Sequence, residues 1–337
     1  MPHSRKPLTT RWLSLIPEIL VADLFTFGEI LALFLASDTD DVKTARTYDL
    51  SAAGAEANVA VAVNRLGLSV SFMSRVGKDE LGDVVISELE EEKLLTQYVT
   101  RVDEYTCALI RNRGTTRPVN VTYLRKSSAG STMCVDDLRE SDIRNSRWVH
   151  ATGITAAISL SAREAVVEAL AIARSHSIKT SFDLNIRRKI WSEDQARETL
   201  FNIAQNVDVL FGGEDEYEVV FGSEKPEQNL EKAIAQGNRI AVMTAGPGLV
   251  RVLDGNSYFE ITPPVVKAVD PVGSGDAFVG GTIAGLLAGI SLKDAIVQGS
   301  KSGASVASQF GDWAGLPFGV KGISSLTEAI TRERATS

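Results

Sequence analysis

The sequence has very little cysteine and histidine, and this scarcity excludes several kinds of functional site. Only two cysteines, Cys107 and Cys134, occur in 337 residues, and they do not have the spacing of a metal site. A disulfide framework is therefore excluded, and the composition fits the reducing cytoplasm. The three histidines (His3, His150 and His176) are scattered, which argues against a His-based catalytic triad and against a zinc centre.

Long apolar runs are missing as well. No stretch approaches the ~20 apolar residues that a membrane-spanning helix needs. Near the start, basic residues precede the apolar stretch Leu13–Leu20, but Pro17 and Glu18 interrupt that stretch and no small-residue cleavage site follows. We therefore expect residues 1–20 to be an extension, or a helix packed on the outside, ahead of a single domain over residues 21–337.

Positive charge is also in short supply. The chain has 35 Lys and Arg against 43 Asp and Glu, a net charge of −8, so nucleic acid and anionic membranes are poor partners. The same field repels nucleotides and sugar acids, so local Arg, Lys, Mg²⁺ or backbone N–H groups must hold any such ligand. With 44% hydrophobic and 23% charged residues, the chain can build a large core.

Strand-like and helix-like segments alternate along most of the chain, which predicts a mostly parallel sheet with helices on both faces. The expected strands are Val21–Ile30, Val70–Arg75, Ser146–Ala151, Thr180–Leu184, Val207–Phe211, Arg239–Thr244 and Leu249–Leu253. The expected helices are Glu56–Leu66, Leu81–Glu92, Ala162–His176, Asp194–Gln205, Gly275–Leu287, Leu292–Gln309 and Ser324–Glu333. Residues 33–50 and 106–125 break this rhythm with short strands and turns, and we expect them to form a small β-lid over the carboxyl ends of the main strands.

The most informative motif is Asp-Pro-Val-Gly-Ser-Gly-Asp-Ala-Phe at residues 270–278. Gly273, Ser274 and Gly275 precede Asp276 and a long helix of small apolar residues. A bend that opens into a helix directs backbone N–H groups at one point, and the helix dipole makes this point suitable for phosphate. A carboxylate beside such an anion site is useful if it takes a proton from a hydroxyl that attacks phosphorus. The alternative is a simple Gly-rich turn, in which Asp276 only favours the dipole.

Other polar residues lie beside turns and strand ends. Gly54 precedes a helix that bears Asn58, whose amide suits a polyol, although small residues in this helix equally allow close packing. Asn185 and Arg187 follow the expected strand Thr180–Leu184, where side chains are well placed for a site. Arg187 could grip a phosphate or a carboxylate, and a solvated loop is the alternative.

Two further candidates carry charge. Glu216 ends the run Gly-Glu-Asp-Glu after the strand Val207–Phe211, where carboxylates can hold Mg²⁺ through water or can simply stabilise a helix N-terminus. Tyr123 and Arg125 alternate along a strand, so they share a face. Arg125 could pair with a carboxylate through a two-pronged hydrogen bond, unless it is an ordinary surface residue of the lid.

Together and in this order, these segments resemble the ribokinase-like (PfkB) carbohydrate kinase family, from about Val21 to Pro317. Residues 270–278 are similar to its carboxy-terminal signature, and residues 53–67 are similar to its amino-terminal one. The resemblance implies one kinase domain with a three-layer Rossmann-like α/β fold, helices on both faces of the sheet, and a small β-lid that often serves in forming homo-oligomers.

Within the family, residues 54–58, 123–129, 182–191 and 311–317 are most similar to kinases of the sugar acid 2-keto-3-deoxygluconate. The resemblance therefore implies ATP and Mg²⁺ as cofactors and the terminal hydroxyl of this sugar acid as acceptor, with 2-keto-3-deoxy-6-phosphogluconate as product. It also implies a role for each candidate residue. Asp276 would be the base, with Gly273, Ser274 and Gly275 as the anion hole. The sugar acid would contact Gly54, Asn58, Tyr123, Arg125, Arg187 and Asp312. The nucleotide would contact Asn185, Arg187, Thr244, Gly246, Gly248, Gly273, Gly275 and Ser300, and Glu216 would be linked to Mg²⁺.

The chain departs from the family pattern at several positions away from the proposed base and anion hole: Ala53, Leu124, Gly213, Leu249 and Ser300. A kinase for fructose, ribose or a nucleoside is the nearest alternative, but a neutral sugar has no need of Arg125. A nicotinamide-dependent oxidoreductase fits less well, because the Gly-rich motif falls late in the chain and has Phe278 in place of its third glycine.

Overall fold

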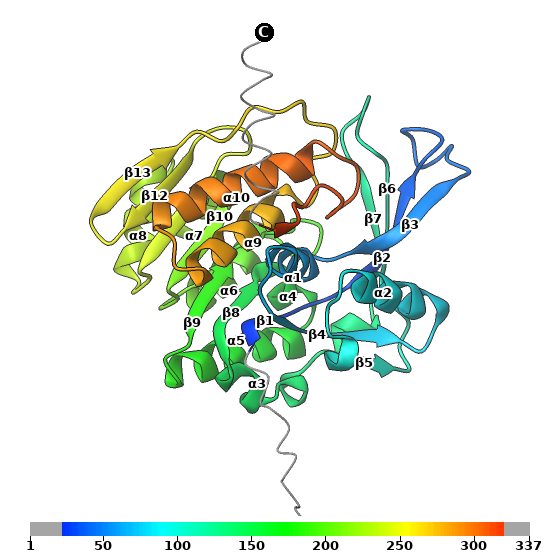
Figure 1. Cartoon of the computed structure of the whole chain (residues 1–337), viewed down its shortest axis with the longest axis horizontal. Helices are drawn as coiled ribbons and strands as arrows, with labels where there is room; N and C mark the ends of the chain where they lie inside the picture. Colours follow the sequence, from blue (N-terminus) through cyan, green and yellow to red (C-terminus); the bar gives the residue numbers. More distant parts are fainter. Residues whose placement is uncertain (1–21, 320–337) are drawn as a thin grey trace, which may run out of the picture.

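The computed structural model describes residues 22–319, which form a layered α/β unit and a small second sheet (Figure 1). The expected extension at residues 1–20 and the expected helix Ser324–Glu333 lie outside the described residues. Within residues 22–319, no helix is both long enough and apolar enough to span a bilayer.

In this part of the chain, nine strands form the central sheet, in the order β13-β12-β11-β10-β9-β8-β1-β4-β5. The pairs from β11 to β5 are parallel, and β12 and β13 extend the sheet in antiparallel fashion. The strands are β1 (Ala22–Phe27), β4 (Val70–Gly77), β5 (Val99–Val102), β8 (Ser146–Thr152), β9 (Lys179–Asp183), β10 (Val209–Gly213), β11 (Ile240–Thr244), β12 (Val250–Asp254) and β13 (Ser257–Ile261). The predicted, mostly parallel sheet is confirmed.

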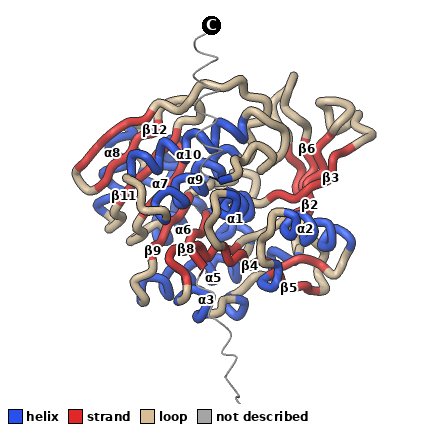
Figure 2. The backbone as a smooth tube through the Cα atoms, viewed as in Figure 1, coloured by secondary structure: helices blue, strands red, loops and turns tan. Residues whose placement is uncertain are grey.

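Helices cover both faces of this sheet (Figure 2). In β1, Leu24 belongs to the core on one face and Phe25 to the core on the other, because successive side chains of a strand point in opposite directions. The first face carries α1 (Ala55–Arg65), α2 (Glu80–Glu91), α9 (Ser274–Leu287) and α10 (Leu292–Ala307). The second carries α3 (Glu140–Arg144), α4 (Gly153–Ile158), α5 (Leu160–Ser175), α6 (Glu193–Ile203), α7 (Glu214–Phe221) and α8 (Pro226–Ala235).

The second sheet is the expected β-lid, and it stands beside α2 at the right of Figure 1. Its described strands are β2 (Leu31–Ala36), β3 (Tyr48–Ala53), β6 (Ala108–Arg111) and β7 (Val121–Leu124), in the order β3-β2-β6-β7. The predicted strand Val21–Ile30 is wrong at its carboxyl end. It extends three residues too far, because β1 stops at Phe27 and the first lid strand begins at Leu31. The break lies at Gly28, where the chain passes so close to α1 that a Cβ atom would lie 2.3 Å from the Glu56 carboxylate.

Small residues let three helices on the first face pack closely. A Cβ atom at Gly280 of α9 would lie 2.6 Å from the Cβ of Ala62 in α1. A Cβ atom at Gly299 of α10 would lie 2.5 Å from the carbonyl oxygen of Phe278 in α9. This packing holds the first turn of α9 against the first turn of α1, at the edge of the sheet where β9, β10 and β11 end.

His150 lies inside β8, which continues to Thr152. Its ring is fully buried, and Nδ1 lies 2.9 Å from the Ser181 hydroxyl. Burial lowers the pKa of His150 to about 3, so the ring is a neutral part of the core.

Candidate active site

The described residues enclose three adjoining cavities along the carboxyl ends of the main strands. A middle cavity of ≈ 400 Å³ shares Gly273 and Asp276 with a second of ≈ 260 Å³ beneath the lid, which we call the lid cavity. On its other side, the middle cavity shares Gly275 and Phe278 with a third, also of ≈ 260 Å³, which we call the apolar cavity. The first turn of α9 therefore borders all three.

Gly273 caps the N-terminus of α9 in a conformation that only glycine adopts easily. Its φ is 78°, and a Cβ atom would lie 2.4 Å from the carbonyl oxygen of Asp312. Gly275 has open space where its Cβ would be. The N–H groups of the first helical turn have no acceptor within the helix, so this bend forms an anion-binding site.

Ser274 lies differently from its two glycine neighbours. Both its N–H and its hydroxyl donate to the carbonyl oxygen of Pro271, at 3.2 and 2.7 Å, and it borders the apolar cavity. Ser274 therefore shapes the loop, and the glycines and the helix N-terminus form the wall of the middle cavity.

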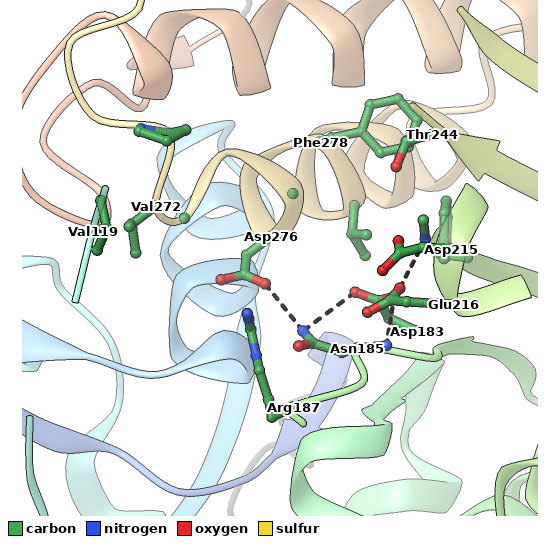
Figure 3. A pocket seen from close by; sticks show the side chains of 17 residues that line it. Val119, Asp183, Asn185, Arg187, Asp215, Glu216, Thr244, Val272, Asp276 and Phe278 are labelled. Carbon is green, nitrogen blue, oxygen red and sulfur yellow. Dashed lines mark hydrogen bonds between the residues drawn. The ribbon is translucent and has the colours of Figure 1, made fainter. Parts of the chain in front are cut away.

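Asp276 lies in the first turn of α9 and borders both the middle cavity and the lid cavity (Figure 3). Asn58 Nδ2 donates to Oδ2 of Asp276 at 2.7 Å, and Asn185 Nδ2 lies 3.5 Å from Oδ1. Burial raises the pKa of Asp276 to about 6, although Arg187 and Asn58 favour the ionised form. At neutral pH the carboxylate is therefore ionised, and its pKa is suited to accepting a proton.

Asn185 and Arg187 come directly after β9 and reach the same place. Asn185 adopts a φ of 34°, which turns the chain sharply behind Asp183. The Arg187 side chain points toward Asp276 (Figure 3) and lines both the middle and the lid cavities. Within the described residues, neither a hydrogen bond nor an ion pair holds its guanidinium, so this cation is available to a ligand.

Glu216 lies in the middle cavity, but both its oxygens accept backbone N–H groups. Gly213 donates at 2.8 Å and Ile186 at 2.6 Å, so the carboxylate fixes the loops after β9 and β10. Burial raises the pKa of Glu216, and burial next to Glu216 and Asp276 raises that of Asp183.

The acids of the middle cavity fit a magnesium ion that is held mainly by a phosphate ligand. Within residues 22–319, no group of three or more Asp, Glu, His or Cys side chains could hold a metal by itself. However, Mg²⁺ keeps several waters and usually binds one or two carboxylates together with substrate phosphates. Asp183, Asp215 and Glu216, which line the cavity opposite the N-terminus of α9, supply such carboxylates.

The lid cavity holds buried polar atoms that lack a partner. Arg125 pairs with Glu29 at 2.8 Å and lies over the ring of Tyr123, 4.3 Å from its centroid. In the described part of the chain, its Nη1 and the Oδ1 of Asn58 are buried without a hydrogen-bond partner. Since buried polar groups are nearly always satisfied, one unused donor on a cation and one unused acceptor indicate a ligand with anionic and hydroxyl groups. Gly54 and Asp312 also line this cavity.

The apolar cavity contains half of the expected nucleotide contacts, including Gly275 at its boundary with the middle cavity. Thr244, Gly246 and Ser300 line it, together with Pro and Val side chains from residues 263–266. The Ser300 hydroxyl donates to the carbonyl oxygen of Ile296 within its own helix. Gly248 lies in the same turn but does not border the cavity, because its N–H closes that turn onto Ala245.

Sequence reasoning missed four buried charged residues at this site. Glu29 holds Arg125, Glu56 accepts the hydroxyls of Thr152 and Thr155, and Arg111 pairs with Asp270 and Asp312. Glu29 could have been found, because a charged residue that interrupts an apolar run such as residues 21–36 needs a partner. Glu56 and Asp270 lie inside the motifs at residues 54–58 and 270–278, but nothing in either motif shows that they are buried. Arg111 gave no local signal, since contacts between distant segments bury it.

An α/β fold with an anion-binding helix N-terminus, a buried carboxylate beside it and a covering β-lid defines a small-molecule kinase. Residues 21–318 match the family described as pfkB family carbohydrate kinase, so this chain belongs to the PfkB family of carbohydrate kinases. It is 33% identical to the 2-dehydro-3-deoxygluconokinase of Bacillus subtilis over 300 residues, 88% of this chain and 92% of the relative. It is 31% identical to the 2-dehydro-3-deoxygluconokinase of Thermoproteus tenax over 89% of this chain and 93% of the relative. It is also similar to the crystal structure of the Thermotoga maritima 2-dehydro-3-deoxygluconokinase, with a TM-score of 0.81 and 25% identity over 90% of this chain and 98% of that one.

Proposed function

We propose that this protein is an ATP-dependent kinase for 2-keto-3-deoxygluconate, which is also called 2-dehydro-3-deoxygluconate, and that it phosphorylates the terminal hydroxyl. The observation that carries the proposal is the position of Asp276, which lies between the lid cavity and the anion site at the N-terminus of α9. Relatives named for this activity in B. subtilis and T. tenax support the choice of substrate.

The sugar acid occupies the lid cavity. Arg125 binds its carboxylate end, with Tyr123 beneath the guanidinium and Glu29 fixing its direction. Asn58 accepts a hydrogen bond from a hydroxyl through its unused Oδ1. The terminal hydroxyl then lies at Asp276, at the boundary with the middle cavity.

Asp276 removes the proton from this hydroxyl while the oxygen attacks the terminal phosphorus of ATP. The bond from this phosphorus to the bridging oxygen breaks, and the products are 2-keto-3-deoxy-6-phosphogluconate and ADP. Such a positioned proton transfer contributes about 10²–10⁴-fold in rate. The N–H groups behind Gly273 and the cation of Arg187 stabilise the charge on the moving phosphoryl group, and alignment of the two substrates supplies much of the remaining acceleration. The lid excludes water, which limits wasteful hydrolysis of ATP.

The nucleotide spans the other two cavities. Its base packs in the apolar cavity between residues 263–266 and α10, and its phosphates lie in the middle cavity. Mg²⁺, when bound to these phosphates, neutralises part of their charge. One or two of the carboxylates of Asp183, Asp215 and Glu216 would hold the ion, with waters completing its coordination.

A panel assay tests the substrate. ADP release is measured with 2-keto-3-deoxygluconate, its galactonate isomer, fructose, ribose and a nucleoside. The isomer is included because a relative 31% identical in Haloferax volcanii is named 2-dehydro-3-deoxygalactonokinase. We expect the gluconate-derived acid to give the highest kcat/KM and all neutral sugars to give far lower values, because only an acid uses Arg125. A preference for a neutral sugar would overturn the proposal.

Two further features bear on the oligomeric state and the cellular compartment of the protein. Leu50 and Leu124, on the edge strands of the lid, are 41% and 51% exposed, and they suit an interface between the lids of two copies. The cysteines are unpaired, and Cys107 is buried, which suits a reducing cytoplasm. The mass in solution, measured by light scattering for the protein and for Leu124→Glu, tests the interface: we expect a dimer that this change splits.

A further inference from the structure

Arg111 is the largest fully buried side chain in the described part of the chain. It ends β6 of the lid, yet its guanidinium reaches the main domain. Nη2 donates to Asp270 at 2.7 Å and to Asp312 at 3.2 Å. One cation therefore joins the lid to two carboxylates of the active site, and all three side chains are at most 7% exposed.

Asp270 passes this connection to the anion site. Its Oδ1 accepts the N–H of Val272 at 3.2 Å, and its Oδ2 accepts the N–H of Gly311 at 3.3 Å. The same carboxylate thus holds the bend that leads into Gly273 and the loop that leads into Asp312. The two loops also pack closely on each other, since a Cβ atom at Gly273 would lie 2.4 Å from the carbonyl oxygen of Asp312. A shift of Arg111 would therefore be passed to both loops.

Arg111 and Asp312 also line the lid cavity. The Nε of Arg111 is buried without a partner in the described residues. A sugar acid that enters this cavity therefore meets the group that holds the phosphate-binding bend.

We propose that Arg111 is a positioning residue that couples occupancy of the lid cavity to the geometry of the anion site. The inference rests on the proposed function. Sugar acid beneath the lid fixes the position of the Arg111 guanidinium, and this guanidinium holds the Asp270 carboxylate in place. Asp270 in turn holds residues 272–275 in the conformation that binds the terminal phosphate of ATP. By reciprocity, nucleotide at the anion site tightens the binding of sugar acid by the same factor.

Calorimetric titrations of the full-length protein test this coupling. The probe is the non-hydrolysable analogue AMP-PNP with Mg²⁺, and its Kd is measured with and without saturating 2-keto-3-deoxygluconate. For the wild type we expect the sugar acid to tighten nucleotide binding at least about 5-fold. In Arg111→Met/Asp270→Asn this ratio should fall to about 1. The double change removes one positive and one negative charge, so the cluster keeps its net charge. Asp312 loses its 3.2 Å contact with Arg111, so the Kd of the sugar acid is measured alone to show that the double variant still binds it.

Arg113→Met is the matched control. Arg113 lies two residues along the same lid segment, but it pairs with Asp49 at 2.7 Å and lines none of the three cavities. The control should keep the wild-type ratio. A purely structural Arg111 would lower Tm and leave the ratio unchanged, so a folded double variant with wild-type coupling would overturn the inference.

Hydrogen exchange of the wild type tests the same idea without any variant. Sugar acid alone, with no nucleotide, should slow amide exchange over residues 270–276. Unchanged exchange in this segment, in a protein that binds the sugar acid, contradicts the coupling. A wild type that neither binds nor phosphorylates the sugar acid instead contradicts the proposed function, so the two failures are distinguishable.

Discussion

The side-chain amide of Asn58 donates a 2.7 Å hydrogen bond to the carboxylate of Asp276, across 218 positions of the chain. The bond joins the first turns of α1 and α9, and it leaves the other amide atom of Asn58, Oδ1, free for a ligand. Asp276 is thereby held in one orientation, in which it borders both the lid cavity and the middle cavity.

The pH dependence of the reaction should report the ionisation of Asp276. Because the pKa is raised to about 6, kcat/KM should rise about tenfold per pH unit below pH 6 and level off above it. Asn58→Asp places a second negative charge beside Asp276, which raises the pKa of Asp276. The rise of kcat/KM on the acid side of the pH profile should therefore move to higher pH. A profile that is flat from pH 5 to 8 would be inconsistent with Asp276 as the base.

Arg125 should matter for the sugar acid and not for ATP. We expect Arg125→Met/Glu29→Gln, which removes the buried pair together, to raise the Michaelis constant for the sugar acid about 10- to 100-fold, the worth of a charge-assisted hydrogen bond. The Michaelis constant for ATP should stay within about 3-fold. Arg117→Met, which changes an exposed lid arginine paired with Asp41, is the control and should alter neither constant. Equal losses for both substrates would remove the assigned role of Arg125.

Two glycines of the anion site should respond differently to alanine. In Gly273→Ala, the new Cβ atom would lie 2.4 Å from the Asp312 carbonyl oxygen, and the alanine would have to adopt a left-handed φ. The substitution should therefore cost at least about 1 kcal/mol of stability. Gly275→Ala has open space and should keep or raise Tm, but its methyl group enters the cavity and should lower kcat/KM. Thermal unfolding and ADP release on both variants separate these effects. Full activity in Gly275→Ala would show that phosphate does not approach this helix N-terminus.

Glu56 should reduce stability at neutral and alkaline pH. Burial raises its pKa from 4.5 to about 7, so the folded protein holds this proton more tightly than the unfolded chain does. The stability that comes from the protonated form is complete below pH 4.5 and is lost as the pH rises to 7. Glu56→Gln should therefore be more stable than the wild type by as much as roughly 3 kcal/mol at pH 8, with a smaller gain at pH 5.

Denaturant unfolding at the two pH values measures the effect of Glu56→Gln. Glu198→Gln, at an exposed position of α6, is the control and should change little at either pH. If Glu56→Gln is less stable than the wild type at pH 8, the carboxylate stabilises the fold in its ionised form and the assignment is wrong.

The parts of the fold and site that could be predicted are those with a local signal. The central strands are continuous apolar runs, and the motif at residues 270–278 contains its own bend, helix and acid. The edge strands β5 and β13 escaped prediction because their exposed positions are polar, as in Arg101 and Glu260. The connection from Arg111 to Asp270 spans 159 positions. Nothing near Arg111 in the sequence shows that it is buried, so only the packing of lid against domain reveals its partners.

Turnover by Asp276→Asn tests the proposed mechanism most directly, because this isosteric change can keep the 2.7 Å bond from Asn58 and gives up only the 3.5 Å contact with Asn185, but removes the base. With 2-keto-3-deoxygluconate and ATP, we expect kcat to fall about 10²–10⁴-fold, while Tm does not fall and the Kd values for both substrates change little. Turnover at the wild-type rate by this variant would contradict the claim that Asp276 takes the proton from the attacking hydroxyl.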